Sequence, residues 1–385
     1  MQSYNGFVRK PHYYDIFGGS APQKNKEVKP MKKLIFLLLI LVFVLSGCKN
    51  TEPTIPTVPA EPVGDCSFSM YDIYPGESMV ISLYPQIFGD KIVFSSVSNP
   101  DLFVSNPNKL YIHDINSGEE ISFDTSIYAA YLSGDYLYGN KSRELIKMNI
   151  QTGEEEILFS APKSKPFGVS KGGSGRYFVF WVSGDNYKDA EFYFYDTKKE
   201  KYTSFFEGNI LDPNHDFKVK NDFVAFVQKE ADGEYTFYGV YLPTNKSTVL
   251  HKTETVPYQY LYNGNFLLWS DKNGIHYLKD GAVSDIENES DDLDIYGNRY
   301  VFFSHYRQIY IYDIETSQTV FTTDEGYGEK DFNYPYYSTL FALDEESGKT
   351  CFIKWNDESA LSYYGSWEHG GYPELISVID IKELS

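Results

Sequence analysis

From residue 66 onward, the hydrophobic and polar positions repeat in units that begin with a turn. Each unit opens on a Gly or Asn turn followed by a β-branched and aromatic run, as in Gly89–Phe94 and Gly175–Trp181. A tight turn directly before such a run predicts a β-hairpin. Seven copies of this pattern occur, at 89–94, 134–138, 175–181, 221–226, 264–269, 297–303 and 348–353.

The second half of each unit is a strand that ends in Asp or a similar turn residue, a short polar loop and a return strand. The clearest copy is LYIHDINSGEEISF at 110–123. Further copies lie at 146–159, 192–205, 238–250, 275–286 and 309–321. The last copy, 375–385, stops before its return strand. We expect residues 65–71 to supply that strand, so that the two ends of the chain close one blade and leave no unpaired edge.

Four strands in each unit, with a period of roughly 40 residues, predict an all-β, seven-bladed β-propeller of four-stranded blades. A β-sandwich explains the pattern less well, because it does not require the same unit seven times. The hairpin Tyr-x-x-Asp-x-x-x-Gly-Glu at Tyr111–Glu119 resembles those of bacterial extracytoplasmic propellers, including the Tol-system and low-density-lipoprotein-receptor-like groups. The resemblance covers 65–385 and implies a propeller architecture. It implies membership in neither the WD40 family nor the receptor family, because the WD40 and Tyr-Trp-Thr-Asp signatures are absent.

An apolar run near the start of the chain predicts export. Leu34–Leu45 follows Met31-Lys32-Lys33 and is too short for a membrane span, which needs about 20 residues, so it is typical of a secretory signal peptide. The exit Leu45-Ser46-Gly47-Cys48 resembles the lipobox of bacterial lipoproteins, and this resemblance implies that Cys48 carries a diacylglycerol. The alternative is a retained anchor with Cys48 as an ordinary cysteine.

These features predict three parts of the chain. Residues 1–47 are an upstream extension and a lipoprotein signal peptide, which is removed, and we interpret 1–30 as an over-long start with translation beginning at Met31. Residues 48–64 are the lipidated Cys and a Pro/Thr-rich linker, extended because a proline recurs every third residue from 53 to 62. Residues 65–385 are the propeller. We therefore expect a lipid-anchored protein on the extracytoplasmic face of the membrane, at the cell surface or in the periplasm.

Charge narrows the choice of partner. The chain has a formal net charge of −20, and without residues 1–47 it keeps 27 of its 34 basic and 52 of its 54 acidic residues, a net charge near −25. Nucleic acid is excluded as a partner, because phosphate backbones are bound mainly through Lys and Arg. Cations, neutral sugars and basic peptides remain.

Two cysteines follow Cys48. We expect Cys66 and Cys351 to stay unpaired, because a whole strand between them separates them by about 9 to 10 Å, whereas a disulfide needs Cα atoms within about 7 Å.

Motifs for catalysis and metal binding are mostly absent. Lys171–Gly175 approaches a nucleophile elbow, but it lacks the second glycine at the required spacing and precedes a strand. The acidic run Asp285–Asp294 could offer oxygens to calcium, yet it lacks the EF-hand alternation and the central glycine, so a solvated run is favoured. We expect no catalytic residue, no cofactor and no bound metal.

Three long connections, 98–108, 322–336 and 356–374, predict a ligand-binding face near blades 7 and 1, because such loops often carry function. The candidate residues are Tyr327, Asp331, Tyr334, Tyr336, Tyr363, Tyr364, Trp367, Glu368, His369 and Tyr372. Carboxylates beside exposed aromatic rings suit sugars, or a protein anchored by Tyr and Trp. The structural alternative is an Ω-loop packed on itself.

The sequence therefore predicts a membrane-tethered, non-enzymatic protein that binds a protein or a glycan of the cell envelope or the environment, with the membrane contacted through the lipid alone. One alternative is a glycan lyase or hydrolase, in which Glu368, His369 and Asp331 perform the acid and base steps. Another is a structural scaffold of an envelope complex.

Overall fold

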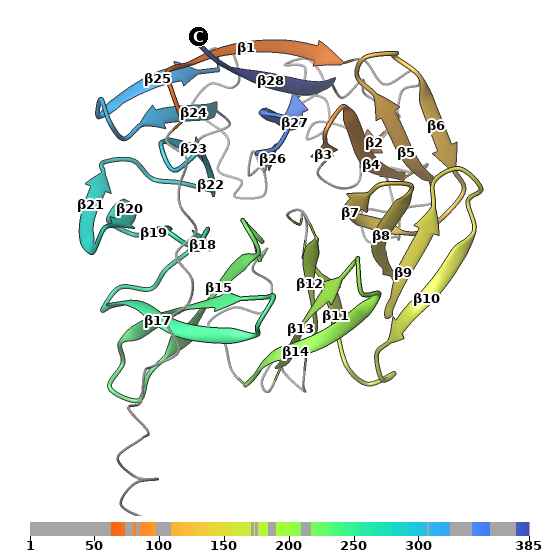
Figure 1. The fold of residues 1–385 in the computed structure, drawn as a ribbon, viewed down its shortest axis with the longest axis horizontal. Helices are drawn as coiled ribbons and strands as arrows, with labels where there is room; N and C mark the ends of the chain where they lie inside the picture. The colour runs from red at the N-terminus through yellow and green to blue at the C-terminus, as the bar shows by residue number, and fades with distance from the viewer. Residues whose placement is uncertain are drawn as a thin grey trace, which may run out of the picture. The chain divides into compact units, whose positions relative to one another are not determined.

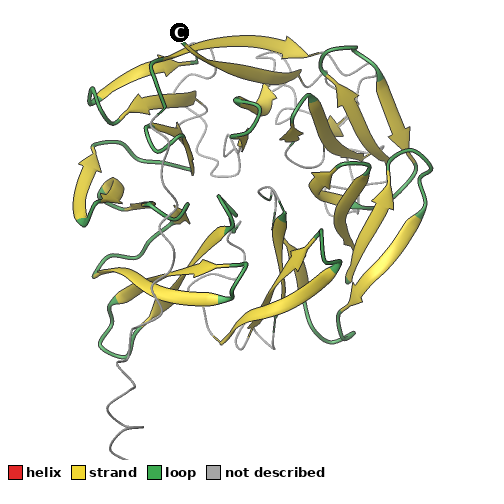
Figure 2. Cartoon of the chain, viewed as in Figure 1, coloured by secondary structure: helices red, strands yellow, loops and turns green. Residues whose placement is uncertain are grey.

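The computed structural model describes residues 63–73, 80–81, 85–97, 109–170, 173, 176–183, 190–208, 217–305, 308–323, 341–354 and 375–384. They belong to one compact unit, Ile55–Ser385. Within this unit seven antiparallel sheets surround a central axis (Figure 1). The described residues contain strands, turns and loops but no helix (Figure 2). The predicted all-β, seven-bladed propeller is confirmed.

The blades follow one another along the chain. Blade 1 contains β2 (Val80–Ile81), β3 (Gln86–Phe88), β4 (Lys91–Val97), β5 (Lys109–Asp114) and β6 (Glu120–Phe123). Blade 2 contains β7 (Tyr128–Ser133), β8 (Tyr136–Lys141), β9 (Glu144–Asn149) and β10 (Glu155–Ser160). Blade 3 contains β11 (Phe167–Val169), β12 (Tyr177–Val182), β13 (Ala190–Asp196) and β14 (Lys201–Gly208). Blade 4 contains β15 (Phe223–Lys229), β16 (Tyr235–Tyr241) and β17 (Lys246–Thr253).

The remaining three blades complete the ring. Blade 5 contains β18 (Gln259–Tyr262), β19 (Phe266–Asp271), β20 (Gly274–Lys279) and β21 (Ala282–Ile286). Blade 6 contains β22 (Asp292–Tyr296), β23 (Tyr300–His305), β24 (Gln308–Asp313) and β25 (Gln318–Thr322). Blade 7 contains β26 (Phe341–Asp344), β27 (Lys349–Lys354), β28 (Leu375–Glu383) and β1 (Cys66–Ile73).

Burial follows the place of a strand within its blade. Every residue of the second strand β12 is buried, whereas the outermost strand β14 alternates between exposed and part-buried positions. A strand covered on both faces by neighbouring sheets can be apolar throughout, while an outer strand keeps one face in water. Aromatic runs such as YFVFWV therefore mark the second strand of a blade.

The core consists of seven hydrophobic clusters, and each lies between two neighbouring blades. Between blades 2 and 3, for example, the rings of Tyr138 and Phe178 lie 5.2 Å apart, and those of Tyr138 and Tyr195 lie 5.6 Å apart. Such aromatic pairs stabilise a core beyond the area that they bury. Aromatic side chains of the described strands therefore help to hold neighbouring blades together.

The two ends of the described chain close blade 7. Strand β1 pairs with β28 in antiparallel register, with Cys66 opposite Glu383 and Ile73 opposite Ile376. The strand order β1-β28-β27-β26 confirms the predicted closure through residues 65–71. Strand β28 separates Cys66 from Cys351 on β27, and both cysteines are free, as predicted.

The outer hairpins use Asp as a turn residue, as the repeat indicates. Asp114 Oδ1 accepts the backbone N–H groups of Asn116 and Ser117 at 3.1 and 2.9 Å, and its Oδ2 pairs with Lys91 at 3.0 Å. The Ser117 N–H and the Lys91 ammonium lower the pKa of Asp114 to about 2. The Asp114 carboxylate therefore accepts backbone N–H groups of the turn and, through Lys91, also links the end of β5 to the start of β4.

Two blades depart from four regular strands. In blade 1, two short strands, β2 and β3, both pair with β4 at the inner position. In blade 4 the inner position is held by a single bridge between Lys220 and Phe223. The turn between them places Asn221 and Asp222 at φ 48° and 66°, both in the left-handed region. A hairpin turn with two such residues normally carries Gly at the second position.

The predicted signal peptide, Cys48 and the proline-rich part of the linker lie outside the described residues. Among the residues that are described, no helix is long and apolar enough to cross a membrane.

Candidate functional site: an axial cavity

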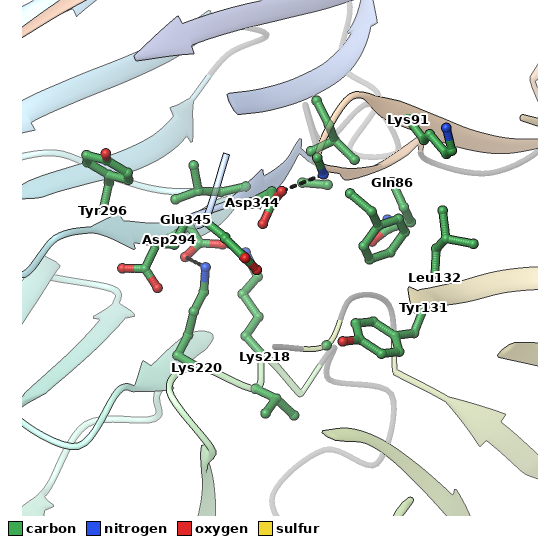
Figure 3. A pocket seen from close by; sticks show the side chains of 18 of the residues that line it. Gln86, Lys91, Tyr131, Leu132, Lys218, Lys220, Asp294, Tyr296, Asp344 and Glu345 are labelled. Atoms are coloured by element: carbon green, nitrogen blue, oxygen red, sulfur yellow. Dashed lines mark hydrogen bonds and ion pairs between the residues drawn. The ribbon is translucent and has the colours of Figure 1, made fainter. Parts of the chain in front are cut away.

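The inner strands and turns of blades 1, 2, 4, 6 and 7 surround a cavity of about 920 Å³ (Figure 3). We call it the axial cavity. Its wall comes mainly from β3, β7, β22 and β26, from the turns that follow them, and from the segment before the blade 4 turn. Most of the described lining therefore comes from the inner position of these blades.

Two lysines of blade 4 reach two aspartates of blade 6 across this wall. Lys218 Nζ lies 2.8 Å from Asp292 Oδ1 and 3.7 Å from Asp294 Oδ2. Lys220 Nζ lies 2.8 Å from Asp294 Oδ1. Lys218 also donates a hydrogen bond to the carbonyl of Leu293. Figure 3 shows both lysine side chains extending toward the blade 6 carboxylates.

Burial makes this network sensitive to any change of partner. The side chains of Lys220 and Asp294 are only 7% and 4% exposed. Asp292 accepts the backbone N–H of Phe341 at 3.3 Å, which links blade 6 to blade 7. Burial raises the pKa of Asp292, although the neighbouring Lys218 ammonium opposes the rise. Removing one partner of such a network leaves a buried charge without compensation.

The turn after β26 adds further carboxylates. Asp344 Oδ2 accepts the backbone N–H of Gly89 and the hydroxyl of Ser347, both at 2.7 Å, so that it joins blade 7 to blade 1. Glu345 Oε1 accepts the backbone N–H of Gly297 at 3.1 Å, so that it joins blade 7 to blade 6. Desolvation raises the pKa of Glu345, and the Lys220 ammonium only partly offsets this rise. Glu345 is therefore a group that holds a proton more readily than a surface carboxyl.

Aromatic rings complete the wall. Tyr131 is buried, and burial raises its pKa to about 12. The ring of Phe341 lies 5.1 Å from Lys218 Nζ, within the range of a cation–π contact. Gly173 lies against the Tyr131 ring, where an added Cβ would come within 2.7 Å of Tyr131 Cδ2. Only glycine therefore fits beside this ring.

The axial cavity therefore combines hydrogen-bond acceptors, lysines that are paired with carboxylates, and aromatic surface. Carboxylates and a tyrosine can bind hydroxyl groups, and a carboxyl whose pKa is raised by burial can also donate a proton. Among the described residues, no group of three or more His, Cys, Asp or Glu is placed to hold a metal ion.

None of the predicted ligand-binding residues is among the described residues. Tyr327, Asp331, Tyr334 and Tyr336 lie in 324–340, and Tyr363, Tyr364, Trp367, Glu368, His369 and Tyr372 lie in 355–374, both outside the described residues. The described ends of 355–374 are Lys354 and Leu375, which pair with each other. They lie at the end of β27 away from the turn that carries Glu345.

The acidic run 285–294 has a different role from the calcium site considered for it. Asp285 pairs with His276 at 2.7 Å, and Glu289 lies 4.0 Å from His305. Asp292 and Asp294 pair instead with the lysines of blade 4. These four carboxylates thus turn toward separate side chains and do not converge on one point.

Sequence reasoning missed the lining because it took the turn as the start of each unit. The residues just before each turn line the axis, among them Gln86, Tyr131, Lys218 and Lys220. One signal was available, since charged residues alternate with apolar ones in Lys218-Val219-Lys220 and Asp292-Leu293-Asp294. Alternation of this kind predicts one polar face on a strand. What it cannot predict is that the two polar faces meet.

Comparisons with known proteins support the fold. No protein-family model and no curated protein sequence match the chain. An oligogalacturonate lyase in complex with manganese matches with a TM-score of 0.52 at 10% identity, over 84% of this chain and 99% of its own. The oligogalacturonate lyase of Vibrio parahaemolyticus matches with a TM-score of 0.51 at 9% identity, over 83% and 98%. The β-propeller domain of the trilobed protease of Pyrococcus furiosus has a TM-score of 0.48 at 14% identity, over 70% and 89%.

These identities show a shared fold and no more. The resemblance to bacterial extracytoplasmic propellers therefore holds for the propeller architecture, and nothing supports the Tol-system or receptor-like group in particular. Our expectation that the protein is not an enzyme is contradicted, because the two oligogalacturonate lyases, which match with TM-scores above 0.5, are enzymes. A lack of sequence motifs does not exclude catalysis on this fold.

Proposed function

We propose that the protein is a glycan-active propeller whose ligand occupies the axial cavity. The observation that carries this proposal is the axial cavity itself, which is lined by carboxylates, lysines and aromatic rings. Its volume of about 920 Å³ lies at the upper end of the range of small-molecule sites, about 300 to 1,000 Å³. Carboxylates of blades 6 and 7 and the ring of Tyr131 supply the acceptors and the apolar surface that sugar rings require.

Glu345 is the residue that we propose as the proton donor of a cleavage step. Desolvation raises its pKa, and a general acid works best when its pKa lies near the working pH. Its backbone partner Gly297 N–H holds one carboxyl oxygen and leaves the other for a ligand. The lyases with the same fold act on a glycan by name, which supports this class of substrate.

The test combines binding and product analysis on the purified protein. Short neutral, acidic and amine-bearing oligosaccharides are titrated by calorimetry and then incubated with the protein. An unsaturated product, detected by its ultraviolet absorbance, identifies a lyase, and a new reducing end without unsaturation identifies a hydrolase. Glu345→Gln should lower cleavage about 100-fold or more, and Glu254→Gln, at an exposed strand-end position, should leave it unchanged. If no oligosaccharide binds, the proposal is wrong.

We further propose that a lipid on Cys48 anchors the protein to the extracytoplasmic face of a membrane. The support is the twelve-residue apolar run that ends in Leu-Ser-Gly-Cys. Two or more acyl chains hold a soluble domain on a bilayer almost permanently. Cys48→Ser should abolish fatty-acid labelling and leave the precursor uncleaved, and undiminished label would contradict the anchor.

A further inference from the structure

The charges that line the axial cavity are unequal. The described lining contains seven carboxylates against three lysines. A recess whose wall carries an excess of one sign concentrates the field inside it and raises the local concentration of ions of the opposite sign. The excess of carboxylates over lysines therefore affects which charge on a glycan the axial cavity favours.

Each of the three lysines already has a carboxylate partner within the cavity wall. Lys91 pairs with Asp114 at 3.0 Å, Lys218 with Asp292 at 2.8 Å, and Lys220 with Asp294 at 2.8 Å. An anionic sugar could use one of these lysines only by separating it from its aspartate. For the two lysines of blade 4, this would leave a buried carboxylate without its cation, which is strongly unfavourable.

The excess negative charge lies on one turn. Asp90 has a cation from outside the lining, because Lys349 Nζ lies 2.9 Å away. Among the described residues, no ion pair reaches Asp344, Glu345 or Glu346, which are consecutive on the turn after β26. Asp344 and Glu345 accept hydrogen bonds from backbone N–H groups and from the Ser347 hydroxyl, donors that carry no net charge.

We propose that the axial cavity selects a glycan that carries a protonated amine, with the ammonium group directed to the turn Asp344–Glu346. This inference rests on the proposed function and names its substrate class. An ammonium group supplies up to three charge-assisted hydrogen bonds, which are about twice as strong as neutral ones. The hydroxyl groups of the same sugar bind the remaining acceptors, and the rings of Tyr131 and Phe341 provide apolar surface.

The electrostatics of Glu345 agree with this assignment. Its pKa is raised by desolvation, and the carboxylates of Asp294 and Asp344 add to the rise. Glu345 therefore keeps the proton that it donates in the proposed cleavage step, and the ammonium group is directed to the flanking carboxylates of Asp344 and Glu346.

The experiment compares three oligosaccharides of equal length on the full protein: glucosamine, N-acetylglucosamine and galacturonate oligomers. We expect the glucosamine oligomer to bind about tenfold or more tightly than the N-acetylated one, because acetylation removes the charge. Added salt should reduce this preference. The galacturonate oligomer should bind most weakly.

Matched variants assign the preference to the turn. Glu346→Gln and Asp344→Asn should each reduce glucosamine binding and leave N-acetylglucosamine binding within about twofold, whereas Glu254→Gln should change neither. Circular dichroism and a denaturation midpoint check that each variant is folded. Because Glu346 is exposed, Glu346→Gln remains a test if loss of the Asp344 hydrogen bonds impairs folding.

The outcomes separate this inference from the proposed function. Tightest binding of galacturonate, or equal binding of the glucosamine and N-acetylglucosamine oligomers, would overturn the amine preference while a glycan site stands. Failure of all three oligomers to bind would overturn both.

Discussion

At the scale of single residues, Lys220 is the buried cation on which the charge balance of the axial cavity depends. We expect Lys220→Met to lower the free energy of unfolding by about 3 kcal/mol, because it leaves Asp294 buried without its nearest cation. Chemical denaturation measures the change. The control is Lys246→Met at an exposed position of β17, which should stay within about 0.5 kcal/mol. Equal effects of the two substitutions would show that the buried pair is not special.

Blade 5 contains a histidine held between two carboxylates. His276 Nε2 lies 2.9 Å from Asp271 and its Nδ1 lies 2.7 Å from Asp285, while the ring stacks on Trp269. Burial works against the charged imidazole, but the hydrogen bonds to both carboxylates outweigh it and raise the pKa of His276. The ring of His251 lies 5.1 Å from that of Trp269, and burial lowers the pKa of His251.

These opposite shifts predict opposite pH dependence. His276 contributes stability that is fully present below its unfolded pKa of about 6.5 and is lost as pH rises through its higher folded pKa. His276→Gln should therefore destabilise the protein at pH 6 more than at pH 9. His251 contributes stability that is present above about pH 6.5 and is lost as pH falls toward its lower folded pKa, so His251→Gln should show the reverse trend. Denaturation midpoints across this range are the measurement, and parallel curves for both variants would contradict the assignment.

At the scale of elements, the start of β1 is held on blade 6 by one guanidinium. Arg299 donates two hydrogen bonds to Asp313, at 3.0 and 2.8 Å, and one to Asp65 at 2.8 Å. Tyr300 OH accepts the backbone N–H of Cys66 at 2.9 Å. Val63 packs over Gly297, where any Cβ would overlap it. The segment before β1 is therefore part of the propeller and not of the linker.

We expect Arg299→Met to destabilise the protein by about 3 kcal/mol, because Asp313 is buried and would lose its cation. Arg299→Lys should recover only part of the loss, since an ammonium cannot form the two-pronged contact. Arg143→Met, at an exposed position of a blade 2 hairpin, is the matched control. Urea denaturation compares them, and full recovery by lysine would show that charge alone matters.

At the scale of the whole molecule, the closure of the ring predicts how the thiols behave. Cys351 is fully buried on β27 and its pKa is raised by burial, whereas Cys66 is part-exposed on the outermost strand. Apart from Cys48, we expect a thiol reagent to label Cys66 alone in the native protein and both cysteines after denaturation. Mass spectrometry under non-reducing conditions provides the check. A linked Cys66–Cys351 peptide would contradict the strand order β1-β28-β27-β26.

The propeller was predictable because its signals are local and repeated. Turn residues such as Gly89 and Asp114, followed or preceded by aromatic strands, carry the information within a few positions of one another. Each signal is weak by itself, but the same pattern repeated seven times predicts a seven-bladed propeller. Even the long-range pairing of β1 with β28 followed, because a unit without its return strand needs one from elsewhere.

The candidate site was not predictable in the same way. The sequence predicted a ligand-binding site on long loops. The ten residues named in those loops lie outside the described part of the chain, so that site remains a prediction. The axial cavity depends on Lys218 and Lys220 meeting Asp292 and Asp294, which are more than seventy positions away. No local pattern states which inner strands face one another across an axis.

The sequence by itself determined the number of blades, their turns and the strand that closes the ring, because hydrophobic period and turn chemistry act between neighbouring residues. Only the tertiary structure decided which charges converge, which of them are desolvated and which stay paired. Those properties depend on distances between blades and on the exclusion of water, and the same Lys and Asp side chains on an open strand would be ordinary solvated charges.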